Sequence, residues 1–316
     1  MKWVDFAFAE RAILDFANVQ KPDGRIPLWG HDALPKGPHH PKQSSDASSL
    51  PSIFRSAHDI ALKSGRKTTI ETLYGVCRRY LAWWGNCRID SQTGLVSSLF
   101  EETFPPYLGH AGEWSGVDTN VEVARGALLT AELAERLGRG REAEDLRDFA
   151  ACIYAAVEKH LWNERAGLFC PKDLRTGEFG AVSSAGFEMF WDPKLPVDRK
   201  ARMLQELKGP RFGWNHYPLT SVARDDPAFT ITRGDRYRFN ASWSGMIWST
   251  IVIRVVEALE FCGCHAEADA LKARFTAMIE RAGEFREFYD PDDGSGHGAR
   301  DYAWTAAHYI QLKSQK

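Results

Sequence analysis

The stretch "ERLGRGREAEDLRDFAACIYAAVEKHLWNERAGL", residues 135–168, carries the pattern that decides the fold. A helical segment ends at Gly138, and a second segment leads to an acidic turn that Gly167 closes. Apolar residues in this second segment, among them Leu146, Ile153 and Val157, recur at the spacing of one helical face. The stretch therefore predicts a helical hairpin.

The same unit occurs in two other places. Residues 62–95, "LKSGRKTTIETLYGVCRRYLAWWGNCRIDSQTGL", and residues 260–296, "EFCGCHAEADALKARFTAMIERAGEFREFYDPDDGSG", follow the order helix, glycine, helix, acidic turn, glycine. The first glycine of each unit suits the left-handed residue that ends a helix. Long loops separate the units, whereas a solenoid has short connections, so the repeats favour a toroid of helical hairpins.

Helical periodicity dominates the chain, and strand signals are scarce. We expect nine helices, at residues 4–19, 51–64, 67–84, 120–137, 141–162, 196–208, 243–262, 265–283 and 301–313. A ring of six hairpins needs twelve. We expect residues 1–316 to form a single domain. Either short helices lie inside the loops, or the chain starts part-way round the ring. Residues 30–52, rich in proline and serine, are expected to be a loop in which His39 and His40 are solvated.

The composition is that of an ordinary globular protein, with 44% hydrophobic and 26% charged residues. The formal net charge of −2 gives no reason to expect nucleic acid or an anionic membrane as a partner. Asp5 and Glu10 interrupt the apolar stretch that a signal peptide would need, and no apolar run has the roughly 18 residues of a membrane span. The six cysteines have no regular spacing, so we expect reduced thiols in a cytoplasmic protein.

One short segment resembles half of a metal site. Cys262, Cys264 and His265 are close in sequence, but no second Cys or His pair follows at the spacing of a zinc finger. We therefore expect no metal and no cofactor.

Tryptophan is unusually frequent, with 11 residues, and many lie in segments rich in glycine or proline. A large amphipathic ring in a loop indicates a pocket or an interface. The alternative is that these rings pack a second, peripheral core.

Two carboxylates stand out. In "EWSGVDTNVE", residues 113–122, Thr119 and Glu122 fit a capping box, so Asp118 is expected just before a helix. There it could serve only to complement the helix dipole. Glu287, by contrast, is surrounded by Phe285, Phe288 and Tyr289, and carboxylates in such apolar surroundings are suited to acid–base catalysis. The neighbouring acids of residues 290–294 lack the spacing of a calcium loop and are explained by a solvated turn.

Two carboxylates and a tryptophan-rich cleft are the minimum requirement for glycoside hydrolysis. Aromatic rings can stack on the apolar C–H faces of a sugar. Five candidates for such platforms are Trp29, Trp114, Trp243, Trp248 and Trp304.

Four stretches resemble motifs of the inverting (α/α)6-barrel glycosidases related to processing α-glucosidase I and mannosylglycerate hydrolase, with neutral trehalases as more distant relatives. They are "VQKPDGRIP" (19–27), "GEWSGVDTN" (112–120), "ASWSGMIWSTI" (241–251) and "EFYDPDDGSGHGARDYAWTAA" (287–307). The matches occur in the family's order from about residue 12 to residue 313, and the last is the most specific.

The resemblance implies an all-α (α/α)6 barrel and an inverting hydrolase of a small α-linked glucoside or mannoside. The apolar faces of the hairpins are compatible with a monomer or a homodimer. Carried over, Asp118 takes the place of the general acid and Glu287 that of the general base, and Gln20 joins the substrate-binding residues. The chain departs from the family pattern at Trp114 and Met246, where the family has Glu and Pro. These departures concern substrate subsites more than the catalytic pair.

Two other classes of function remain open. The chain could be a glycan-binding or scaffold protein that keeps the acids only as capping and turn residues. It could also be a sugar isomerase on an α/α ring, whose proton shuttles would be histidines; the candidates His58, His110, His216 and His308 share no motif.

Overall fold

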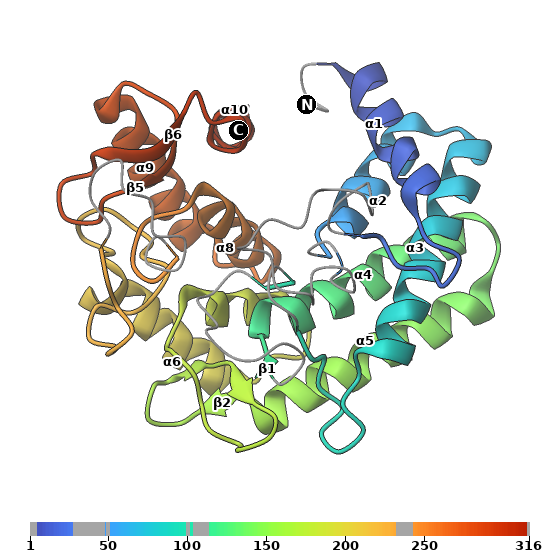
Figure 1. Cartoon of the computed structure of the whole chain (residues 1–316), viewed down its shortest axis with the longest axis horizontal. Coiled ribbons are helices and arrows are strands. Elements are labelled where there is room, and N and C mark those ends of the chain that lie inside the picture. Colours follow the sequence, from blue (N-terminus) through green and yellow to red (C-terminus); the bar gives the residue numbers. More distant parts are fainter. Residues whose placement is uncertain are drawn as a thin grey trace, which may run out of the picture. The chain divides into compact units, whose positions relative to one another are not determined.

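The computed structural model describes residues 5–27, 48, 51–98, 102–103, 114–231 and 243–314 (Figure 1). The helices are α1 (Phe6–Val19), α2 (Ile53–Ser64), α3 (Lys67–Cys87), α4 (Val117–Arg136), α5 (Gly140–His160), α6 (Val197–Lys208), α8 (Ser249–Phe261), α9 (His265–Ala282) and α10 (Ala303–Ser314), with 3-10 helices η2 (Ser184–Trp191) and η3 (Pro210–Phe212). The strands are short: β1 (Trp114–Ser115), β2 (Trp162–Asn163), β3 (Leu168–Phe169), β4 (Lys172–Asp173), β5 (Arg286–Tyr289) and β6 (Gly296–Arg300).

All nine predicted helices are confirmed, and their ends agree within three residues except at the start of α8. We predicted that this helix begins at residue 243, but it begins at Ser249. The reason is a β-bridge: Ile247 and Tyr289 exchange backbone hydrogen bonds of 2.9 and 3.0 Å, which hold Ile247 in an extended conformation. The prediction also missed η2, whose eight residues form no α-helical turn pattern.

The chain divides into two compact units. The first comprises residues 1–103, 109–160 and 173–176, and the second comprises residues 104–108, 161–172 and 177–316. The expectation of a single domain, with or without a missing N-terminal hairpin, stays a prediction.

In the first unit, α4 is the central helix and packs against α2, α3 and α5 (Figure 1). Eleven consecutive residues, from Val117 to Ala127, are buried, so α4 is covered on every side at its N-terminal end. At Gly126 a Cβ atom would lie 2.3 Å from the ring of Phe54, so α2 approaches α4 as closely as it does only because this residue is glycine. By contrast α5 buries one face, as an outer helix does.

In the second unit, α8 has the same role. It packs against η2, α9 and α10, and its first eleven residues, from Ser249 to Leu259, are all buried. A buried ion pair joins α8 to η2, with 2.8 Å between Arg254 and the carboxylate of Glu188. The outer helix α9 buries one face.

The predicted repeat is confirmed in detail. The six glycines, Gly65, Gly94, Gly138, Gly167, Gly263 and Gly294, all have φ between 63° and 78°. After each second helix comes a five-residue turn, at 90–94, 163–167 and 290–294, in which the closing glycine N–H donates to the carbonyl of the first residue at 2.8 to 2.9 Å. That first residue is Asp90, Asn163 or Asp290, and in each turn its side chain accepts a backbone N–H from within the turn. We call these the Asx–Gly turns.

The strands flanking the Asx–Gly turns also share one register. The paired residues are Ile89 with Val96, Trp162 with Phe169, and Tyr289 with Gly296, each one residue before the turn and two residues after its glycine. The three units therefore repeat both the helical hairpin and the β-hairpin that follows it.

Within the residues that the structure describes, no helix combines the length and apolarity needed to cross a membrane. The same residues contain no cluster of three or more metal-ligating side chains, and Cys262 and Cys264 are free thiols.

Candidate functional site

Asp118 lies inside the first turn of α4 and is fully buried. The N-cap is Gly116, so the prediction that Thr119 caps the helix in a capping box with Glu122 is wrong. The first backbone N–H groups of a helix have no partner within the helix, and their partial positive charge favours a carboxylate there. The Asp118 side chain is thus held at a helix N-terminus and away from solvent.

Thr119, the predicted N-cap, and its neighbour Asn120 have other partners. The hydroxyl of Thr119 donates to the carbonyl of Glu102 at 2.7 Å and accepts from the hydroxyl of Ser98 at 2.9 Å. The Asn120 amide accepts from the N–H of Val96 at 2.8 Å and donates to the carbonyl of Gly116 at 2.6 Å. These side chains fasten the segment after the first Asx–Gly turn to α4, and the Thr119 hydroxyl is therefore unavailable as a cap.

Thr103 contacts the Asp118 carboxylate directly. Its hydroxyl donates to Oδ1 of Asp118 at 2.5 Å. A Cβ atom on Gly116 would lie 2.6 Å from that same Oδ1 and 2.6 Å from the Thr103 hydroxyl. The contact therefore requires glycine at position 116.

Glu287 lies at a β-bulge between β5 and β6. Arg286 pairs with Arg300 and Phe288 with His297, so two residues of β6, Gly298 and Ala299, face the single residue Glu287. The Ala299 N–H donates to Oε2 of Glu287 at 3.0 Å. Bulges redirect side chains and occur next to active sites.

Gly298 makes this bulge possible. Its φ is +73°, and a Cβ atom there would lie 2.6 Å from Oε2 of Glu287 and 2.7 Å from the ring of Phe288. Both the backbone conformation and the close approach exclude a side chain.

An aromatic cluster adjoins Glu287 along the strand. Trp243 and Trp248 stack face to face, with ring centroids 3.7 Å apart and planes 4° from parallel, and Trp248 lies 5.1 Å from Phe288. The bridge between Ile247 and Tyr289 holds these segments together. The second unit thus brings two of the four sequence motifs into contact.

Hydrogen bonds fix β5 against its neighbours. The Tyr289 hydroxyl donates to the carbonyl of Glu284 at 2.9 Å and accepts from the Arg286 N–H at 3.1 Å, and burial raises the pKa of this phenol. On the other side, Thr305 of α10 donates to the carbonyl of Arg286 at 2.7 Å. Hydrogen bonds to Tyr289 and Thr305 therefore fix the backbone of Arg286, the residue before Glu287.

The remaining predicted substrate-binding residues have varied surroundings. The Gln20 amide donates to the carbonyls of Gly24 and Val76, at 2.8 and 3.0 Å, and accepts from Arg79, so it anchors the turn after α1 to α3. Trp114 is half-buried in β1, and Trp304 is 49% exposed at the start of α10. Trp29, His39, His40 and His110 lie outside the described residues. Substrate binding by these residues stays a prediction.

Sequence reasoning missed Thr103 and Ala299. Thr103 belongs to no recognised motif, and its role depends on a fold that brings it to α4. Ala299 acts through its backbone, although the glycines around it, in "GSGHG", were a visible signal for an irregular strand.

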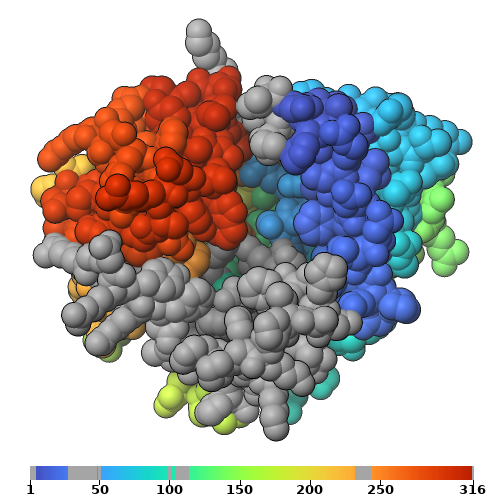
Figure 2. Space-filling model, turned by 45° about the horizontal axis from the view of Figure 1, so that its top comes forward, coloured from blue at the N-terminus to red at the C-terminus, as the bar shows by residue number. Residues whose placement is uncertain are grey.

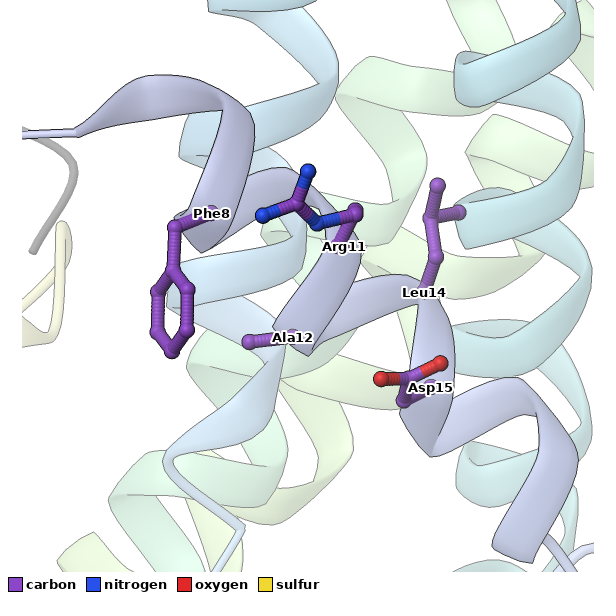
Figure 3. Close-up of a pocket in the computed structure, with 5 residues that line it drawn as sticks. All are labelled: Phe8, Arg11, Ala12, Leu14 and Asp15. Atoms are coloured by element: carbon purple, nitrogen blue, oxygen red, sulfur yellow. The ribbon is translucent and has the colours of Figure 1, made fainter.

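A shallow pocket lies elsewhere on the first unit. It is lined by Phe8, Arg11, Ala12, Leu14 and Asp15, which all belong to α1 (Figure 3). Helix α1 buries only Ala9 and Glu10 and shows much of its surface in the space-filling view (Figure 2). None of the predicted site residues lines this pocket, so we do not assign the chemistry to it.

Comparison with known proteins shows the family. Residues 100–305 match the model of the mannosylglycerate hydrolase MGH1-like glycoside hydrolase domain, and this range includes both Asp118 and Glu287. The chain belongs to this family. The mannosylglycerate hydrolase of Thermus thermophilus is 36% identical over 149 residues, which are 46% of this chain and 33% of that protein.

Other relatives carry related names. The mannosylglycerate hydrolase of Rubrobacter radiotolerans is 30% identical over 186 residues, covering 58% of this chain and 40% of the relative. The glucosylglycerate hydrolase of Mycolicibacterium hassiacum is 30% identical over 173 residues, covering 47% of this chain and 35% of the relative. The matched part of the chain thus spans a third to two fifths of the length of these curated relatives.

Solved structures identify the fold. A GH63 mannosylglycerate hydrolase of Thermus thermophilus, in complex with Tris, superposes with a TM-score of 0.79 at 21% identity, covering 99% of this chain and 90% of that structure. Neutral trehalase Nth1 of Saccharomyces cerevisiae gives a TM-score of 0.65 at 15% identity, covering 86% of this chain and 63% of that structure. The predicted all-α fold of the (α/α)6-barrel class is confirmed.

Proposed function

We propose that this chain hydrolyses the glycosidic bond of a small α-linked glycoside whose aglycone is polar, with mannosylglycerate and glucosylglycerate as the leading candidates. One observation carries the proposal: the glycoside hydrolase family match runs from residue 100 to residue 305 and contains both isolated carboxylates. The relatives named for these two substrates support the choice of sugar and aglycone.

In this proposal Asp118 is the general acid. As the C–O bond breaks, the carboxyl proton moves to the glycosidic oxygen, and the leaving glycerate or other alcohol departs neutral at that oxygen. Complete burial of the side chain supports this role, because an apolar environment disfavours the ionised form of a carboxyl group. The helix N-terminus has the opposite effect, and it stabilises the carboxylate that forms when the proton leaves.

Glu287 is the general base. It takes a proton from a water molecule while the water oxygen bonds to the anomeric carbon, on the face opposite the leaving group, so the configuration inverts. The Ala299 N–H binds Oε2 and orients the carboxylate, and we assign the proton transfer to Oε1. Trp243, stacked on the buried Trp248, would offer a flat apolar face to the sugar ring.

The first experiment tests the reaction and its stereochemistry. The purified chain is incubated with α-mannosylglycerate, α-glucosylglycerate and α,α-trehalose, and proton NMR follows the anomeric signals from the first minutes. The proposal expects hydrolysis of at least one glycerate glycoside with the β-anomer formed first. Saturable binding without released sugar would instead favour the glycan-binding alternative, and initial release of the α-anomer would exclude inversion.

The second experiment tests the two roles separately. Asp118→Asn and Glu287→Gln are each expected to lower kcat by about 10²- to 10⁴-fold, the usual contribution of a positioned acid or base. The matched controls are Asp145→Asn and Glu284→Gln, which remove exposed carboxylates outside the assigned roles. Near-normal turnover by Asp118→Asn or Glu287→Gln would contradict the assignment.

Rescue distinguishes the acid from the base. An α-glycosyl fluoride has a leaving group that needs no proton, so it should restore much of the rate of Asp118→Asn and little of that of Glu287→Gln. Azide needs no deprotonation to attack, so it should accelerate Glu287→Ala and give the β-glycosyl azide. The reverse pattern would exchange the two roles.

A further inference from the structure

We propose that Thr103 is a positioning residue for the acid: its hydroxyl binds Oδ1 of Asp118 and so directs the transferable proton to Oδ2. This inference rests on the proposed function of Asp118. It assigns a task to a residue outside every motif found in the sequence.

The geometry of the contact is the first argument. The hydroxyl donates to Oδ1 at 2.5 Å, which is short for an O–H···O bond and typical of one to a carboxylate. A carboxyl group bears its proton on one oxygen at a time, and an oxygen that accepts a strong hydrogen bond is the poorer site for it. The proton to be donated is therefore placed on Oδ2.

The second argument is that the segment bearing Thr103 is firmly held. The preceding residue, Glu102, is fully buried, and its carboxylate accepts the N–H of Ser48 at 2.7 Å and two guanidinium bonds from Arg88, at 3.1 and 3.2 Å. Its carbonyl accepts the hydroxyl of Thr119, in the helix turn that also carries Asp118. Two hydrogen bonds thus join this segment to the first turn of α4: one from Thr119 to the carbonyl of Glu102, and one from Thr103 to Asp118.

The buried network around Glu102 extends further into the first unit. The Ser48 hydroxyl donates to the carbonyl of Ile26 at 2.8 Å and lies 2.7 Å from the hydroxyl of Tyr80. A buried polar group costs stability unless it is bonded, so this set of bonds specifies one position for the segment. If Thr103 only filled space beside α4, its segment would not need to be fixed by such a network.

The hydrogen bond from Thr103 should also strengthen during the proposed reaction. When Oδ2 gives up its proton, the negative charge spreads over both oxygens of Asp118, and the bond from Thr103 becomes stronger because its acceptor is now charged. The hydroxyl thus stabilises the product state of the proton transfer. A hydrogen bond that becomes stronger as charge develops stabilises the transition state more than the ground state, so it lowers the activation barrier.

Other charged groups on the elements packed here are paired with one another. Glu102 pairs with Arg88 at 3.1 Å, and Glu122, one turn along α4, pairs with Arg125 at 3.5 Å. At the far end of α4, Glu132 pairs with His58 of α2. Replacing Thr103 by a residue without a hydroxyl changes none of these pairs directly.

The test compares Thr103→Val, which keeps the shape, with Thr103→Ser, which keeps the hydroxyl. Thr103→Val should lower kcat on the glycerate glycoside by about 10- to 100-fold and leave the rate on the α-glycosyl fluoride within about threefold of normal. It should also move the alkaline limb of the kcat/KM profile upward by about one pH unit, because a lost donor disfavours the ionised acid and raises its pKa. Thr103→Ser should restore both properties.

Three outcomes would overturn the inference. If Thr103→Val slows both substrates equally and leaves the alkaline limb in place, the residue has only a packing role; the midpoint of thermal unfolding of each variant is measured alongside. If Thr103→Val behaves as the wild type while Asp118→Asn is inactive, the inference fails and the proposed function stands. Normal activity of Asp118→Asn would overturn both.

Discussion

The hydroxyl of Thr103 and the Oδ1 atom of Asp118 are 2.5 Å apart, and each would be 2.6 Å from a Cβ atom on Gly116. The Asp118 carboxylate and the Thr103 hydroxyl therefore both lie against the backbone of Gly116, at the start of α4. Neither polar group could keep this position if the loop before α4 carried a side chain there. The arrangement can be tested without touching either polar group.

We predict that Gly116→Ala lowers kcat by about tenfold or more, because the new methyl group displaces the carboxylate or the hydroxyl. The measurement is steady-state kinetics together with thermal unfolding. The matched control is Gly140→Ala at the start of α5, where a Cβ atom would meet nothing within 4 Å. Equal activity of the two variants would show that the contact at residue 116 has no bearing on turnover.

A second pair of glycines isolates the bulge at Glu287. Gly298 and Gly283 have nearly the same φ, +73° and +71°, so the backbone strain that alanine introduces should cost a similar amount, about 1–2 kcal/mol of stability, at either position. Only at Gly298 would the Cβ atom also meet Glu287, whereas at Gly283 there is nothing within 4 Å. We expect Gly298→Ala alone to abolish most activity. A much larger loss of kcat in Gly298→Ala than in Gly283→Ala, measured in the absence of urea on variants shown to be folded, would support this, and similar losses of kcat would contradict it.

Substitutions of the two stacked tryptophans should have different effects, one on the free energy of unfolding and the other on KM. Trp248 is only 1% exposed, so Trp248→Ala should lower the free energy of unfolding by about 3–5 kcal/mol. Trp243 is half-buried, so Trp243→Ala should cost little stability but raise KM by about 3- to 10-fold, the value of one ring contact. Urea unfolding and initial rates measure the two effects. An unchanged KM in Trp243→Ala would remove it from the substrate-binding residues.

His58 should make stability depend on pH. Burial by itself lowers the pKa of this imidazole, but hydrogen bonds and charges from Asp59 and Glu132 outweigh it and raise the pKa from 6.5 to about 9. The protonated ring lies 2.8 Å from Glu132 in the folded state. Because the folded pKa is the higher one, the stabilisation is complete below about pH 6.5 and is lost as the pH rises through about 9.

The urea midpoint of the wild type, relative to His58→Gln, should therefore fall between pH 6.5 and pH 9. The control is His265→Gln, at the exposed start of α9, which should show no such trend. A constant difference between wild type and His58→Gln over this range would contradict the predicted ion pair.

The repeat could be predicted from sequence because its signals are local. Glycine is required where φ is positive, and the six glycines of the three units occupy such positions regardless of what packs around them. The apolar stripes of α5 and α9 are likewise a property of each helix alone. The helix boundaries followed from these two signals.

The errors arose where distant segments decide the structure. Thr119 has the right type and place for an N-cap, but Ser98 and the carbonyl of Glu102 engage its hydroxyl, and the helix begins three residues before the predicted start. The segment before α8 is apolar enough to be helical, but Ile247 pairs with Tyr289 and residues 243–245 form a turn. Thr103 could not be found at all, since its contact with Asp118 exists only after both segments have folded.

The shared geometry of the Asx–Gly turns gives the proposed base an equivalent place in each of the three units. Glu287 stands three residues before the third turn, and the corresponding places before the other two hold Cys87 and His160. A repeated framework can thus hold the proposed base in one copy while the other two copies keep the same turn. Replacing the equivalent β-hairpin of another unit by residues 286–300 would test whether the bulge at Glu287 forms outside its own unit.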